Sequence, residues 1–219
     1  ADVRAIPTYD NGQGTIALST TLQNLTTKKA KDLSIRWSLY KNKVFNDDNE
    51  LVATFNDKNA QTVCNGNANS ELRQTITVNH VAPWTAEEPN VYVLVGELMQ
   101  GKKVVETISF QTGFRTVEIK DTPAQQDEFG LAGRYYYING KALKLKGVNR
   151  HDTNPLTGKV ISREQMEHEI MLMKQANINH IRTSHYPNDP YFYYLCNKYG
   201  IYLESEANIE SHEYFYGKA

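Results

Sequence analysis

The sequence predicts two folds in series, a β-sandwich up to about residue 119 and the opening of a parallel α/β barrel after it. The first observation is an alternation of apolar and polar residues that recurs in short segments of the first half. The second is a change of pattern in the second half to strand, helix, strand, helix, strand. The predicted fold class is therefore multidomain, with β structure followed by α/β structure.

Five segments of the first half alternate in the way of strands that bury one face. In residues 33–40, Leu33, Ile35, Trp37 and Leu39 fall on the same face, and we predict that Trp37 anchors the core. The other four segments are residues 14–22, 72–78, 92–98 and 104–110. Short strands at this spacing are typical of a β-sandwich.

The second half begins with a segment that contains residues typical of turns and loops. Residues 120–133 contain Asp121 and Pro123 near the start and Gly130 and Gly133 near the end, and they are predicted to be a linker or loop. Asn139-Gly140 separates two short apolar runs, 135–138 and 142–145, which is a strong signal for a two-residue hairpin turn. A strand ending at Asn149 follows. We therefore place the domains at 1–119 and 120–219.

Two helices alternate with the remaining predicted strands. Ser162, followed three residues later by Gln165, predicts a capping box at the start of the first helix. Met166, Ile170 and Met173 then form an apolar face, which we interpret as core. The second helix covers 189–199 and is closed by a glycine, and strands are expected at 180–182 and 201–204.

Composition excludes several classes of function. The formal net charge is −1, so the chain lacks the basic surface of a nucleic-acid-binding protein. Its apolar runs are too short for a membrane helix, and its first residues do not resemble a signal peptide, so we expect a piece of a longer polypeptide. Cys64 and Cys196 lie in different predicted domains, which favours two free thiols.

Polar, titratable residues follow each of the three predicted barrel strands. They lie in residues 149–152 (NRHD), 183–187 (TSHYP) and 206–212 (EANIESH). The carboxyl ends of barrel strands carry the functional groups of such folds. The last cluster contains Glu210 and His212, whose spacing in an extended segment puts both side chains on one side, where they could share a cation such as Mg²⁺. A solvated loop pair explains the same spacing.

Several motifs resemble glycoside hydrolase family 2. They are residues 82–92 (APWTAEEPNVY), 113–118 (GFRTVE), 179–187 (NHIRTSHYP), 199–203 (YGIYL) and 206–212. The last of these looks like the β-galactosidase branch of the family. The resemblance implies an immunoglobulin-like β-sandwich followed by the first βα units of an incomplete (β/α)8 barrel. It also implies a complete enzyme that cleaves terminal β-D-galactose with retention of configuration.

The resemblance also assigns roles to individual residues. In similar enzymes the acid/base glutamate follows the fourth barrel strand and the nucleophile follows the seventh, so we expect no catalytic carboxylate within this chain. His151 and His185 correspond to sugar-contacting histidines, and Arg182 corresponds to the arginine beside the nucleophile. Glu210 and His212 correspond to Mg²⁺ ligands of the complete enzyme.

Two glutamates are close enough in sequence to suggest a catalytic pair, and we reject that interpretation. Glu204 and Glu206 do not match the family's catalytic positions, and Glu206 is expected instead to orient the loop that carries Glu210. Asp152 departs from the family, since a glutamate often stands there.

The alternatives are a β-glucuronidase of the same family and a non-catalytic sandwich that binds carbohydrate or a protein partner. The expected partner of the complete enzyme is a β-galactoside, with neither nucleic acid nor membrane. A homo-oligomer formed through the open barrel edge is a hypothesis. We expect a cytoplasmic protein, with the periplasm as the alternative compartment.

Overall fold

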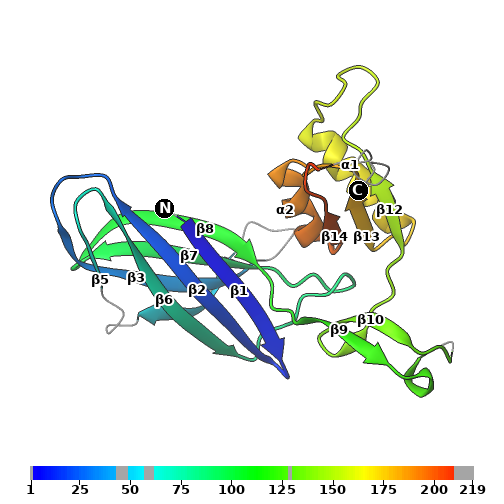
Figure 1. The fold of residues 1–219 in the computed structure, drawn as a ribbon, viewed down its shortest axis with the longest axis horizontal. Coiled ribbons are helices and arrows are strands. Elements are labelled where there is room, and N and C mark those ends of the chain that lie inside the picture. Colours follow the sequence, from blue (N-terminus) through cyan, green and yellow to red (C-terminus); the bar gives the residue numbers. More distant parts are fainter. Residues whose placement is uncertain (1, 43–48, 57–61, 128–129, 210–219) are drawn as a thin grey trace, which may run out of the picture. The chain divides into compact units, whose positions relative to one another are not determined.

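The computed structural model describes residues 2–42, 49–56, 62–127 and 130–209, and it divides the chain into two compact units. The first unit contains Ala1–Thr85 and Asn90–Leu143, and the second contains Ala86–Pro89 and Lys144–Ala219. Figure 1 shows the elements of each unit. The division that we predicted between residues 119 and 120 falls inside a strand and does not coincide with these units.

The first unit is built around two antiparallel sheets. One sheet has the order β1 (Asp2–Asp10), β2 (Gln13–Asn24), β6 (Ala68–Asn79), and the other has the order β4 (Asn49–Asn56), β3 (Ala30–Asn42), β7 (Tyr92–Gln100), β8 (Lys103–Thr112), with β5 (Thr62–Cys64) also paired to β3. The five predicted strands are therefore confirmed. Strands β1 and β4 were not predicted because neither contains a fully buried residue, so their apolar alternation is weak.

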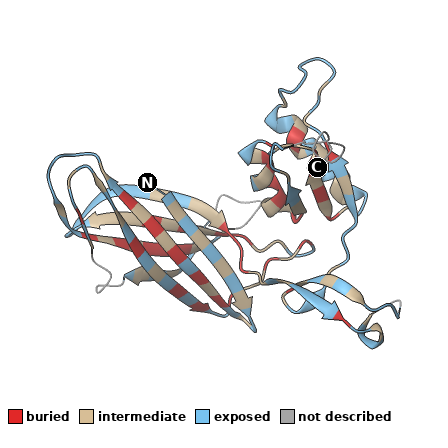
Figure 2. Ribbon diagram, in the orientation of Figure 1, coloured by how far each residue is buried: buried red, intermediate tan, exposed pale blue. Residues whose placement is uncertain are grey.

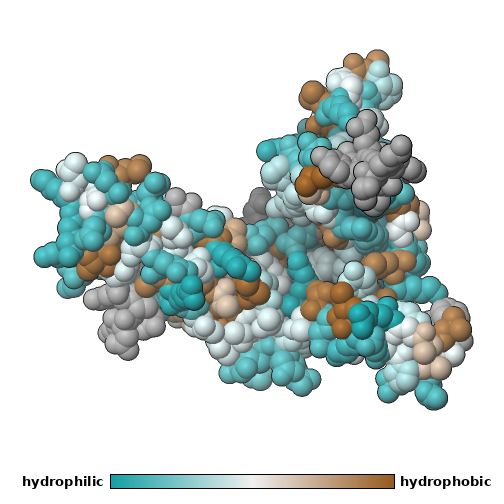
Figure 3. Space-filling model, viewed as in Figure 1, coloured by the Kyte–Doolittle hydropathy of each residue, from teal (hydrophilic) through white to brown (hydrophobic). Residues whose placement is uncertain are grey.

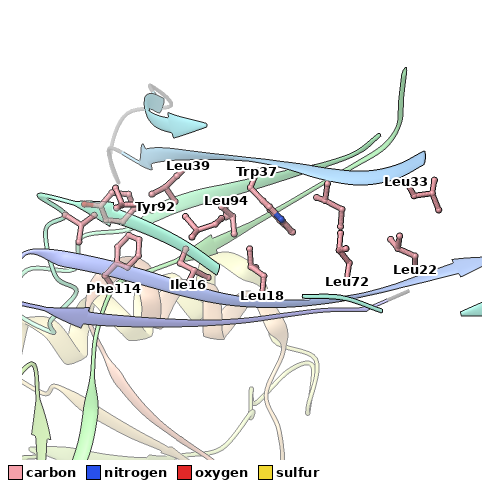
Figure 4. Packing of buried hydrophobic residues seen from close by; sticks show 14 of the residues in the cluster. Ile16, Leu18, Leu22, Leu33, Trp37, Leu39, Leu72, Tyr92, Leu94 and Phe114 are labelled. Atoms are coloured by element: carbon pink, nitrogen blue, oxygen red, sulfur yellow. The ribbon is translucent and has the colours of Figure 1, made fainter. Parts of the chain in front are cut away.

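The core lies between these two sheets. Figure 4 shows side chains from β2 and β6 meeting those from β3 and β7, and Figure 2 shows the buried positions alternating along the strands. Trp37 is completely buried, as predicted, and its indole Nε1 donates a hydrogen bond to Gln74 Oε1 at 2.9 Å. Gly96 lies beneath this indole, where a Cβ atom would come within 2.5 Å of the ring. The core therefore requires glycine at that position.

Two of the motifs that carried the family resemblance contact each other inside the first unit. The backbone N–H of Trp84 donates to the carbonyl oxygen of Phe114 at 2.8 Å, and the guanidinium of Arg115 lies 4.6 Å from the centre of the Trp84 ring. A Cβ at Gly113 would stand 3.0 Å from the Cβ of Trp84. Trp84 and the segment at 113–118 thus form one packed feature of the first unit.

A third antiparallel sheet completes the first unit. It consists of β9 (Val117–Thr122), β10 (Gly133–Ile138) and β11 (Lys141–Ala142), in the order β11-β10-β9. Asn139 and Gly140 both have positive φ, 49° and 79°, as a tight hairpin turn requires, so the predicted turn is confirmed. The predicted loop over 120–133 was wrong at its start, because residues 120–122 pair with β10 as part of β9; a 3₁₀ turn, η1 (Ala124–Gln126), follows.

The second unit is a parallel sheet with two helices. Its elements are β12 (Gly147–Arg150), α1 (Arg163–Gln175), β13 (His180–Thr183), α2 (Pro190–Tyr199) and β14 (Tyr202–Ser205), and the strands have the order β12-β13-β14. This confirms the predicted alternation of strands and helices. Met166 and Ile170 of α1 pack with Phe192, Leu195 and β13 in one apolar cluster.

The helix ends follow the predicted signals with one difference. Ser162 Oγ accepts the backbone N–H of Gln165 at 3.2 Å, as an N-cap should. A capping box also predicts a hydrogen bond from the backbone N–H of Ser162 to the Gln165 side chain. That part of the prediction was wrong, because the Gln165 side chain hydrogen-bonds with Asn154 and Glu169 instead. Gly200 ends α2 in the left-handed conformation, with φ 75°.

Both cysteines are free, as predicted, and the structure buries both side chains. Burial raises the pKa of the Cys196 thiol to about 12. We therefore expect iodoacetamide to leave Cys196 unmodified at pH 8 in the native protein and to modify it in urea, measured by mass spectrometry of its tryptic peptide. Equal labelling with and without urea would contradict the burial.

The raised pKa of Cys196 also makes the stability of the protein depend on pH. Between pH 9.0 and about 12 the folded thiol keeps its proton while the unfolded thiol loses it. The Cys196 thiol therefore lowers the free energy of unfolding as the pH rises through that window.

The visible surface is mainly hydrophilic. Figure 3 shows hydrophobic side chains in scattered groups on the face that it displays. Within the described part of the chain, neither helix is long and apolar enough to cross a membrane.

Candidate active site

The carboxyl ends of the three parallel strands meet at one edge of the second unit. Arg150, Thr183 and Ser205 are the last residues of β12, β13 and β14, and they lie in register with one another. The residues that follow therefore leave the sheet side by side, and they include His151 and Glu206. This is the edge where barrel folds carry their functional groups. All the contacts below lie within the second unit.

Arg182 is the centre of a polar cluster at this edge. Its Nε and Nη2 donate to Glu206 Oε1, and its Nη1 donates to Asn149 Oδ1 at 3.3 Å. The same Nη2 lies 3.1 Å from His185 Nδ1, and His185 Nδ1 lies 2.8 Å from Glu206 Oε2. The backbone N–H of Glu206 donates to the fully buried Thr183 at 3.1 Å. Glu206 is thus anchored by its backbone and paired through both carboxylate oxygens.

Glu206 carries a negative charge in this environment. Burial alone would raise the pKa of its carboxyl, but the hydrogen bonds from His185 and Arg182, together with the charge of Arg182, lower that pKa by more. The carboxylate is therefore ionised at neutral pH. The Glu206 and Arg182 side chains are 23% and 33% exposed, so the pair is close to solvent and can be reached by a ligand.

The two histidines singled out in the sequence are brought together. The rings of His151 and His185 have centres 5.7 Å apart and meet edge to face, and the Tyr186 ring lies 6.5 Å from that of His151. Tyr186 Oη accepts the backbone N–H of Asp152 at 2.9 Å, and the Lys159 ammonium lies 4.2 Å from the centre of the Tyr186 ring. Aromatic and imidazole groups side by side offer stacking and hydrogen bonds to a sugar.

Arg150 forms a second, buried network that the sequence did not single out. Its side chain is 4% exposed; Nε donates to Glu169 Oε2 at 2.8 Å, and Nη1 donates to Asn188 Oδ1 at 2.6 Å and to Asp152 Oδ1. Its guanidinium carbon lies 4.0 Å from the centre of the Phe192 ring. Arg150 therefore joins α1, α2 and the loops after β12 and β13. The only sequence signal was its place beside His151 in the NRHD motif.

The remaining candidates have separate surroundings. The Glu204 side chain is 60% exposed, and its carboxylate lies 3.8 Å from His180 Nε2, whereas the Glu206 carboxylate contacts Arg182 and His185. Glu210 and His212 lie outside the described residues. Among the residues that are described, no three His, Cys, Asp or Glu side chains are grouped so that they could hold a metal ion.

Comparison with known families gives two matches. Residues 1–115 match "Glycosyl hydrolases family 2", and residues 130–217 match "Glycosyl hydrolases family 2, TIM barrel domain". A β-galactosidase of Priestia megaterium is 38% identical over 214 residues, which is 93% of this chain and 18% of that protein. A β-galactosidase of Klebsiella pneumoniae is 44% identical over 138 residues, 63% of this chain and 12% of that protein. The chain thus spans less than a fifth of the length of these relatives.

Solved structures share the fold. A family 2 glycosyl hydrolase from Bacteroides cellulosilyticus has a TM-score of 0.78 at 20% identity and covers 97% of this chain and 27% of its own. A β-glucuronidase from Bacteroides uniformis has a TM-score of 0.75 at 23% identity, covering 94% of this chain and 23% of its own. The sandwich and the three-stranded parallel sheet are therefore the family's N-terminal sandwich and the start of its barrel. The chain belongs to glycosyl hydrolase family 2.

Proposed function

We propose that the full-length protein hydrolyses terminal β-D-galactosides with retention of configuration, and that this chain supplies part of its sugar-binding site. The observation that carries the proposal is the cluster of Arg182, Glu206, His185 and His151 at the common edge of three parallel strands. Relatives named β-galactosidase, 38–44% identical to this chain, support galactose as the sugar.

The chain's own residues act by binding and orientation. His151 and His185 hydrogen-bond hydroxyls of the sugar in the −1 position, where such contacts strengthen as the ring flattens toward the transition state. Arg182 holds the nucleophilic carboxylate in its charged form through guanidinium N–H groups that do not bond Glu206. Retaining hydrolysis needs two carboxyl groups about 5 Å apart, and we propose that the full-length protein supplies both from other parts of its barrel.

Glu210 and His212 are proposed to bind Mg²⁺ together with a ligand from outside this chain. A carboxylate and an imidazole form an incomplete set for an ion that prefers six oxygen-rich ligands. Bound Mg²⁺ would supply electrostatic stabilisation of negative charge that develops during the reaction. Chelation with EDTA should lower the activity of the full-length protein, and added Mg²⁺ should restore it; an activity unchanged by EDTA would remove the proposal.

The main alternative is β-glucuronidase activity. β-Glucuronidases from Bacteroides uniformis and Parabacteroides merdae share 23% and 20% identity with this chain, so they support the fold and not the substrate. A non-catalytic sandwich module that binds carbohydrate or a protein partner is the other alternative. The cytoplasmic location and the homo-oligomer remain proposals, which fractionation and light scattering of the full-length protein test.

One assay separates these functions. The full-length protein is incubated with 4-nitrophenyl β-galactoside, β-glucuronide, β-glucoside and β-mannoside, and the 219-residue chain is tested in parallel. We expect the galactoside to have the highest kcat/KM and the short chain to be inactive. A preference for the glucuronide would overturn the galactosidase proposal, and hydrolysis by the short chain would show that a carboxylate within it is catalytic.

A further inference from the structure

Glu206 occupies a position that its sequence neighbours did not predict. One carboxylate oxygen accepts a hydrogen bond from the Arg182 guanidinium, and the other lies 2.8 Å from His185 Nδ1. Its backbone is tied to Thr183, at the end of the neighbouring strand. The side chain therefore bridges two residues of the proposed sugar site, and the loop-orienting role that we expected for it does not account for these contacts.

The contact with His185 decides which ring nitrogen carries the proton. A carboxylate only accepts hydrogen bonds, so the 2.8 Å contact requires a hydrogen on Nδ1. The Arg182 Nη2 atom, 3.1 Å from the same nitrogen, also only donates and cannot bond a protonated Nδ1. The shorter contact, to a charged acceptor, is the stronger of the two. In the neutral ring Nε2 is then the acceptor, available to the hydrogen of a hydroxyl group.

We propose that Glu206 is a positioning residue that holds His185 in the Nδ1–H tautomer, so that Nε2 accepts a hydrogen bond from one hydroxyl of the bound sugar. The inference rests on the proposed function, because it assumes that His185 contacts the sugar. The pairing with Arg182 strengthens the arrangement, since the guanidinium keeps the carboxylate charged and fixes its second oxygen. Glu206 thereby sets the orientation of His185 without contacting the substrate itself.

A double-mutant cycle in the full-length protein tests this coupling. The variants are Glu206→Gln, His185→Phe and the double variant, assayed with whichever aryl β-glycoside the wild type hydrolyses fastest. Glu206→Gln should lower kcat/KM by about 100-fold, which is the effect of a misplaced binding group. In the His185→Phe background, the same substitution should lower kcat/KM by a much smaller factor. Equal losses in both backgrounds would overturn the proposal.

A matched control and a substrate series exclude a general structural effect. Glu204 lies on β14, two residues before Glu206, and its carboxylate contacts His180; Glu204→Gln should change kcat/KM by less than about twofold. Among substrates that each lack one hydroxyl, one should lose its sensitivity to Glu206→Gln and to His185→Phe together. If every substrate in the series loses the same factor, Glu206 only stabilises the fold.

A structural readout keeps the inference separate from the proposed function. In a crystal structure of full-length Glu206→Ala, the His185 imidazole should turn away from its present position while β13 and β14 keep their register. An imidazole that stays in place would overturn the positioning role, whatever substrate the enzyme takes. Failure of the wild type to hydrolyse any β-galactoside would instead count against the galactosidase proposal.

Discussion

Replacing Arg182 with methionine in the full-length protein should lower kcat/KM by about 1,000-fold, the effect of removing a preorganised charged donor from an active site. Arg182 contacts Glu206, His185 and Asn149, so its loss removes the cation that organises the proposed sugar site. We expect most of the change in kcat, because the proposed nucleophile contact matters most in the transition state. Steady-state kinetics with the preferred aryl glycoside measure both constants.

Two further variants interpret that result. Arg182→Lys keeps the charge but loses the planar fork, and should recover only about tenfold of the loss. Arg73→Met removes an exposed arginine, paired with Glu71 on the surface of the sandwich, and should leave kcat/KM within about twofold of wild type. If Arg182→Met retains more than about a tenth of the activity, Arg182 does not hold a reacting group.

The second large effect is expected on stability. Arg150→Met should lower the free energy of local unfolding around α1 and α2 by about 3–5 kcal/mol, the cost of breaking a buried ion pair by removing one partner. The guanidinium is 4% exposed, and its loss leaves Asp152 and Glu169 without their buried cation. Methionine fills part of the volume against Phe192 but offers no donor.

Hydrogen exchange followed by mass spectrometry measures this local effect in the full-length protein. Peptides from α1, α2 and β12 should exchange faster, while peptides from β2, β3 and β7 should be unchanged. Arg134→Met is the control, because the Arg134–Asp121 pair has side chains 70% and 78% exposed, and its loss should leave the exchange of α1 and α2 unchanged. Equal protection of α1 and α2 in wild type and Arg150→Met would contradict a structural role for the network.

Patterns that depend on local periodicity were predicted well. The strands around Trp37, the hairpin turn at Asn139-Gly140 and the helix ends at Ser162 and Gly200 all depend on neighbours within a few residues. Strands β1 and β4 escaped prediction because strands at the edge of a sheet bury little and so lack a clear apolar face. The start of the loop after β9 was misplaced because pairing with β10, not local sequence, keeps residues 120–122 extended.

The candidate site was predicted only in part. His151, His185 and Arg182 were singled out by their motifs, and the structure brings these three residues to one sheet edge. The roles of Arg150 and Glu206 were not predicted, because each depends on partners between 19 and 38 residues away in the chain. The metal-binding role of Glu210 and His212 stays a prediction.

The sequence by itself determined the fold class, the order of strands and helices in the barrel unit, and the family to which the chain belongs. These follow from periodicity, turn chemistry and contiguous motifs, all of which are local properties of a chain. The tertiary structure decided which polar side chains meet. Because parallel register places the ends of β12, β13 and β14 side by side, Glu206 comes to lie between Arg182 and His185, and no local pattern specifies that pairing.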